Sequence, residues 1–198
     1  MKTTLSLTLS AVALAALAGC ASNRASMGAG PAAVTTTTVA AAPAAPMAAA
    51  PRMAAQDMQF VAVAAGSGMY EVEAARMATT KAMDPQVRAY AQMLVQHHTA
   101  NNAELMALVS AKGHRVAPGL PAPLQQKVNT LNGLSGAAFD REFVRMTGVA
   151  DHMAAVNAFE QGQRSVADRD LQAYITKTLP VLRAHLQQAQ DLAGRMAG

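Results

Sequence analysis

Hydrophobic residues recur at spacings of three and four over roughly the last two-thirds of the chain, which is the periodicity of an amphipathic α-helix. Four stretches show this pattern, and none shows the alternation that is typical of strands. Their main apolar positions are Val61, Ala64, Gly68, Val72 and Ala75; Val87, Ala91, Leu94, Leu105 and Leu108; Phe139, Phe143, Met146, Val149, Val156 and Phe159; and Leu171, Ile175, Leu182, Ala189 and Leu192. Four long amphipathic helices of similar length predict an all-α fold, an antiparallel four-helix bundle.

Residues that commonly begin helices set the bounds of the first two. Asp57 is expected to cap a helix that ends near Ala82. Asp84 is followed by Pro85, and an acceptor side chain before a proline predicts the start of a second helix, which should end at Lys112.

The second half of the chain holds one short helix and two long ones. Residues 113–123 contain three prolines and two glycines and predict a loop, after which a short helix is expected at 124–131. Long helices should follow at 135–163 and 168–195, the last one capped by Asp168. The short helix therefore lies in the crossover between the second and third helices of the bundle.

The N-terminal residues have the pattern of a lipoprotein signal peptide. Lys2 precedes an apolar run from Leu5 to Ala18, and Gly19 precedes Cys20, the sole cysteine of the chain. The run is shorter than the roughly 20 residues that a membrane-spanning helix needs. We therefore expect export, cleavage after residue 19 and lipidation of Cys20, although a plain signal peptide with an incidental cysteine is the alternative.

Residues 20–55 are rich in Ala, Pro and Thr and contain no aromatic residue, so they predict a disordered tether. Ala21-Ser22 lack the aspartate that commonly retains lipoproteins at the inner membrane, which favours the outer membrane, facing the periplasm. All seven aromatic residues lie between Phe60 and Tyr174, which indicates one folded domain at 56–198.

Composition excludes several classes of function. The formal charge is only +4 and the basic residues are scattered, so no surface for nucleic acid is expected. The chain has no glycine-rich phosphate loop and no Gly-x-Ser-x-Gly turn. We therefore expect a binding or structural protein rather than an enzyme. It should be attached to the membrane through Cys20, and its partner could be an unidentified protein of the cell envelope.

Four polar residues fall on or beside the apolar stripes, each near the middle of its predicted helix. They are Glu71, His98, His152 and His185. Mid-helix positions of an up-and-down bundle lie at similar heights, so a carboxylate and three imidazoles are expected to form one layer. Such a set can bind a Zn, Cu or Fe ion.

A hydrogen-bonded network without metal would satisfy the same side chains. The di-iron bundles carry Glu-x-x-His motifs, and no glutamate of this chain has a histidine three residues later, which argues against an oxidase or iron store. His97 is predicted to lie at the surface or to contact a member of the layer from outside.

The helical region contains five groups of short motifs in order. They are Gly68-Met69-Tyr70-Glu71-Val72-Glu73; Met93-Leu94-Val95-Gln96-His97-His98-Thr99; Leu134-Ser135-Gly136 with Phe139-Asp140-Arg141; Asp151-His152; and Leu179-Pro180 with Leu182 and His185. Together they resemble the motifs of the bacterial family of exported domains of unknown function numbered 4142. The resemblance implies a ferritin-like helical bundle and supplies no reaction. One departure is His97, because the family usually has aspartate before the histidine of the second helix.

Overall fold

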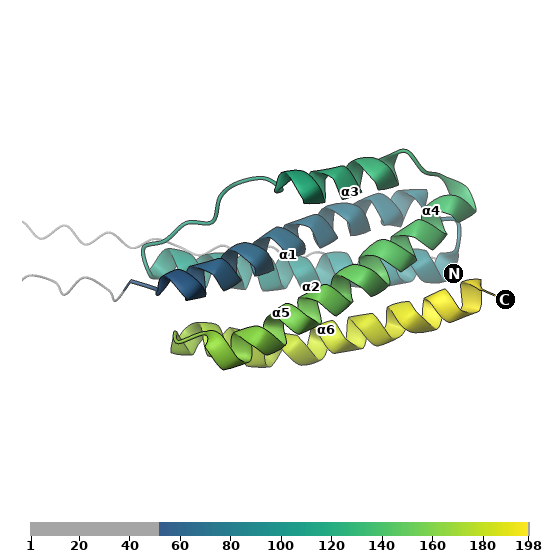
Figure 1. Ribbon diagram of the computed structural model, residues 1–198. Coiled ribbons are helices and arrows are strands. Elements are labelled where there is room, and N and C mark those ends of the chain that lie inside the picture. Colours follow the sequence, from purple (N-terminus) through teal and green to yellow (C-terminus); the bar gives the residue numbers. More distant parts are fainter. Residues whose placement is uncertain (1–51, 198) are drawn as a thin grey trace, which may run out of the picture. The chain divides into compact units, whose positions relative to one another are not determined.

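A computed structural model describes residues 52–197, and the regular structure in this part of the chain is entirely helical (Figure 1). The predicted signal peptide, Cys20 and nearly all of the predicted tether lie outside the described residues. Within them, no helix combines the length and apolar character needed to cross a membrane. The elements are α1 (Ala55–Lys81), α2 (Pro85–Ala111), α3 (Ala122–Asn132), α4 (Gly136–Phe143), the π-helical segment η1 (Val144–Asp151), α5 (His152–Ser165) and α6 (Arg169–Met196).

The helices form a bundle of four rods, one of which consists of α4, η1 and α5 in succession. Short turns join α1 to α2 and α5 to α6, so each of these pairs is antiparallel. Contacts of α1 with α2 and α5, and of α6 with α2 and α5, close the bundle. The crossover from α2 carries α3, which packs on α1 from outside (Figure 1). The predicted all-α fold is confirmed, including the short helix in the crossover.

Two of the three predicted caps are confirmed. The Asp84 carboxylate accepts from the N–H of Gln86, and the Asp168 carboxylate accepts from Asp170 and Leu171. The prediction for Asp57 is wrong, because α1 begins at Ala55 and Asp57 lies within its first turn.

Asp57 serves a different helix pair instead. Its buried carboxylate accepts hydrogen bonds from the N–H groups of Ala167 (2.9 Å) and Asp168 (3.1 Å) in the turn between α5 and α6. Asp140 does the same for the turn between α1 and α2, where it accepts from Met83 and Asp84. Each short turn of the bundle is therefore held by a buried aspartate from another rod.

The rod predicted as a regular helix at 135–163 has nearly the expected extent, but it widens into a π-helix at 144–151. The sequence there disfavours an α-helix, since Val144, Thr147 and Val149 are β-branched and Gly148 has no side chain. A Cβ atom on Gly148 would lie 2.9 Å from the Cβ of Ala189, so glycine allows η1 to approach α6 closely. π-Helical segments of this kind often occur at functional sites.

The apolar interior is divided into two clusters. One contains Leu94, Phe143 and Ala189, and the other contains Leu105, Phe159 and Leu182. Along α2 and along α6 these clusters lie on either side of a histidine, His98 and His185 respectively. A polar layer therefore crosses the middle of the bundle between two apolar regions.

Candidate metal centre

Each of the four rods contributes one side chain to this layer. Glu71 comes from α1, His98 from α2, His152 from the first position of α5, and His185 from α6. They are 1%, 3%, 0% and 1% exposed, respectively. The structure thus brings together all four residues that the sequence indicated.

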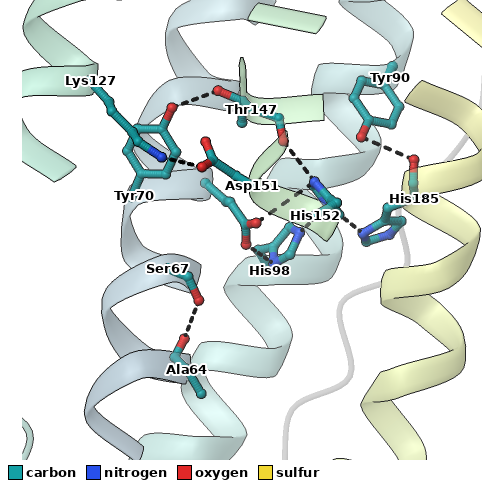
Figure 2. Close-up of polar contacts among 11 residues, drawn as sticks. Ala64, Ser67, Tyr70, Tyr90, His98, Lys127, Thr147, Asp151, His152 and His185 are labelled. Carbon is teal, nitrogen blue, oxygen red and sulfur yellow. Dashed lines mark hydrogen bonds and ion pairs between the residues drawn. The ribbon is translucent and has the colours of Figure 1, made fainter. Parts of the chain in front are cut away.

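The three imidazoles point toward one another at the centre of the layer (Figure 2). His152 Nε2 lies 3.4 Å from His98 Nε2 and 3.3 Å from His185 Nδ1. One nitrogen from each ring lies within 4.8 Å of the other two, which is close enough for all three to bind one metal ion.

The outward nitrogens of His98 and His152 also have partners. His98 Nδ1 lies 3.1 Å from Oε2 of Glu71. His152 Nδ1 lies 2.8 Å from the carbonyl oxygen of Thr147, and a carbonyl can only accept, so His152 carries its proton on Nδ1. Glu71 therefore lies behind His98, on the far side from the converging nitrogens.

The contact between His152 and Thr147 lies at the end of the π-helical segment. Thr147 belongs to this segment, and His152 follows it directly, five residues after Thr147. The backbone N–H of His152 donates to the carbonyl of Val149, and the carbonyl of Thr147 accepts from the imidazole of His152. The sequence predicted a regular helix here and gave no indication of the direction of this carbonyl.

A second ring of polar contacts surrounds the layer. The hydroxyl groups of Tyr70 and Thr147 are 2.8 Å apart, and Lys127 of α3 forms an ion pair with Asp151 (Figure 2). Tyr90 donates a hydrogen bond of 3.2 Å to the carbonyl of His185. Sequence reasoning missed Lys127, because nothing in a crossover helix indicates which face of the bundle it covers.

His97 lies at the edge of the layer. Its Nδ1 is 2.8 Å from Nε2 of His185, and its side chain is half-buried, whereas the other three imidazoles are buried. The sequence left two alternatives for His97, a surface position or contact with the layer from outside. The structure shows the contact with the layer.

Burial sets the charge of the layer. It raises the pKa of Glu71 to about 8, with a further increase from the negative charge of Asp151 and an opposing effect from Lys127. Burial holds the pKa of His98 well below its usual value and lowers the pKa of His152. The pKa of His185 falls to about 3, through burial first and then its neighbours His152 and His97. The imidazoles are therefore neutral, which is the form that binds metal ions.

The sequence comparison identifies the family. Residues 42–192 match the family described as Domain of unknown function (DUF4142). The chain belongs to the DUF4142 family. No curated protein matches the chain.

Solved structures share the fold of this DUF4142 protein at low sequence identity. A DUF305 fragment from Deinococcus radiodurans is 16% identical with a TM-score of 0.65, and the match covers 73% of this chain and 99% of the fragment. A DUF305 protein from Streptomyces coelicolor is 11% identical with a TM-score of 0.62, covering 72% and 92%. CopM in its Cu(II)-bound form is 16% identical with a TM-score of 0.57, covering 70% and 96%.

Proposed function

We propose that this DUF4142 protein is an exported metal-binding protein that holds a copper or zinc ion at His98, His152 and His185. The observation that carries the proposal is the spacing of the three nitrogens. Two ligands of one tetrahedral ion, each about 2.0–2.1 Å from it, lie ~3.3–3.4 Å apart. Nε2 of His152 lies 3.4 Å from Nε2 of His98 and 3.3 Å from Nδ1 of His185, which is this spacing.

The outer contacts support the same conclusion. Histidines that bind metals usually donate their other N–H to a carboxylate, a carbonyl or water, which fixes the tautomer. His98 has Glu71 in this position and His152 has the carbonyl of Thr147. In this proposal Glu71 orients His98 and is not itself a ligand.

The ligand set narrows the choice of ion. Neutral imidazoles suit zinc, copper, iron and nickel, but non-haem iron sites usually add a carboxylate ligand. CopM, which shares this fold, was solved with Cu(II), so copper is the first ion to test. A binding role is favoured over catalysis because His98, His152 and His185 are almost completely buried, which leaves a substrate no direct access to the ion.

We also propose, from the N-terminal sequence, that the protein acts outside the cytoplasm. A signal peptide with Cys20 as the lipidated residue would anchor the domain to the outer membrane, facing the periplasm. A metal-binding domain held there would meet ions that enter the periplasm.

Elemental analysis of the protein purified without a histidine tag tests the proposal directly. We expect close to one copper or zinc ion per chain, and loss of that ion in the His98→Ala and His152→Ala variants. His114→Ala is the matched control, since His114 lies in the loop before α3 and contacts the N–H of Met53. If the wild-type protein stays empty after incubation with copper, zinc and iron salts, the layer is a structural network and the proposal is wrong.

A further inference from the structure

The contact between His97 and His185 is a hydrogen bond between two rings that lie edge to edge. The ring planes differ by only 17°, and the centroids are 5.1 Å apart while the facing nitrogens are 2.8 Å apart. The ring centroids are much farther apart than the facing nitrogens, so the two rings are not stacked face to face. The proton between the two nitrogens therefore lies close to the line that joins them, and it belongs to one ring or the other.

His185 has a second imidazole at its other nitrogen. Its Nδ1 lies 3.3 Å from Nε2 of His152, and His152 Nε2 is an acceptor because His152 carries its proton on Nδ1. A neutral imidazole has one N–H, so His185 can donate toward His152 or toward His97, but not toward both.

These two possibilities correspond to the empty and the occupied centre. Without an ion, His185 Nδ1–H can donate to His152, and His97 Nδ1–H then donates to Nε2 of His185. With an ion, Nδ1 of His185 must present its lone pair to the metal, so its proton has to be on Nε2. Nδ1 of His97 must then accept.

We propose that His97 is the tautomer switch of the metal centre, a donor to His185 when the centre is empty and an acceptor when it is occupied. This inference rests on the proposed function. The protons balance: His97 passes its Nδ1 proton to Nε2 of His185 and takes one from water at its own Nε2, while the Nδ1 proton of His185 leaves to water. The number of protons on the pair does not change.

The position of His97 suits this role. The carbonyl of Thr147 can only accept and therefore holds His152 in one tautomer, whereas an imidazole can donate or accept through the same nitrogen. His97 is also half-buried, so the hydrogen-bonded pair extends from the buried layer toward solvent. His97 is thus a positioning residue, which acts on the ion through His185.

Long-range ¹H–¹⁵N spectra of the imidazole rings test the switch in the full-length protein, with Zn²⁺ as a diamagnetic probe. We expect Nδ1 of His97 to be protonated in the empty protein and unprotonated after one equivalent of Zn²⁺. The same protonation state of this nitrogen in both forms overturns the inference.

Two substitutions test it through affinity. An asparagine amide can donate or accept at the place of Nδ1, so His97→Asn should bind Zn²⁺ within about threefold of the wild type. His97→Phe keeps a ring and loses both capacities, so its affinity should fall about 10–100-fold, as for other partners of metal-binding histidines. His114→Asn is the control for loss of a histidine, and circular dichroism verifies that each variant is folded.

The outcomes separate this inference from the proposed function. If the wild-type protein binds Zn²⁺ and His97→Phe binds it equally well, the switch is wrong and the metal centre stands. If the wild-type protein binds neither Zn²⁺ nor copper, the proposed function fails and the switch fails with it.

Discussion

Oε2 of Glu71 lies 3.1 Å from Nδ1 of His98, and both side chains are almost completely buried. A carboxyl group behind a metal-binding imidazole orients the ring and makes it a stronger ligand. Because burial and Asp151 raise the pKa of Glu71 to about 8, its carboxyl group is mostly protonated at pH 7 in the metal-free protein. A cation among the imidazoles would favour the carboxylate, so in the proposed centre the charge of Glu71 would be coupled to metal binding.

The Glu71→Gln variant is therefore expected to fold normally and to bind copper or zinc about 10–100-fold more weakly. Glutamine matches the shape of protonated glutamate and can still contact His98, but it cannot become negative when the cation binds. Glu73→Gln is the matched control, because Glu73 is an exposed residue of the same helix. Calorimetric titration of both variants measures the effect, and equal affinities would show that the charge of Glu71 plays no part.

The stability of the metal-free protein should fall as the pH drops below about 6.5. The pKa values of His98, His152 and His185 are lowered in the folded state, so below pH 6.5 the unfolded chain binds protons that the folded chain excludes. Glu71 acts in the opposite sense: its raised pKa gives stability that is fully present below pH 4.5 and is lost as the pH rises through about 8. Each group contributes at most about 1.4 kcal/mol per pH unit, so three histidines outweigh one glutamate between pH 6.5 and 5.

Thermal unfolding of the chelator-treated protein from pH 8 to pH 5 checks this expectation. A melting temperature that does not change over this range would mean that the three imidazoles take up protons in the folded state, contrary to their burial.

Helix periodicity and capping residues were sufficient to predict most of the fold. The stripe that starts at Val87 defines α2, and Asp84 and Asp168 cap helices as their neighbours in sequence suggest. Asp57 shows the limit of this reasoning. Its carboxylate binds the amides of Ala167 and Asp168, which are more than 100 residues away, and a local pattern carries no information about such a contact.

The candidate site was predictable in its composition but not in its chemistry. Mid-helix positions indicated that Glu71 and the three histidines share a layer. Which nitrogen of each ring faces the centre depends on the exact place of its partner, such as the carbonyl of Thr147, and on the π-helical turn that presents it. Residue types and spacing do not encode that backbone geometry.

Asp57→Ala is expected to lower the free energy of unfolding by about 2–3 kcal/mol, because two backbone N–H groups of the turn between α5 and α6 lose a charged acceptor. Asp191→Ala is the control, as Asp191 is exposed and should change stability by less than about 0.5 kcal/mol. Urea unfolding followed by circular dichroism measures both. Equal urea midpoints for the two variants would show that the buried carboxylate of Asp57 does not stabilise the turn between α5 and α6.

Gly148→Ala is expected to damage both stability and metal binding. The added methyl group would lie 2.9 Å from the Cβ of Ala189, which would force η1 and α6 apart at a cost of about 1–3 kcal/mol. Because α6 carries His185 and η1 leads into His152, the separation should also weaken zinc binding.

Gly194→Ala is the control within α6. Apart from its own stretch of helix, no atom lies within 4 Å of the added methyl group, and alanine favours a helix over glycine by roughly 0.5–1 kcal/mol. Urea unfolding should therefore show lower stability for Gly148→Ala and higher stability for Gly194→Ala. Zinc titration should show weaker binding for Gly148→Ala alone. If Gly148→Ala binds zinc as the wild type does, the close contact between η1 and α6 does not set the geometry of the histidines.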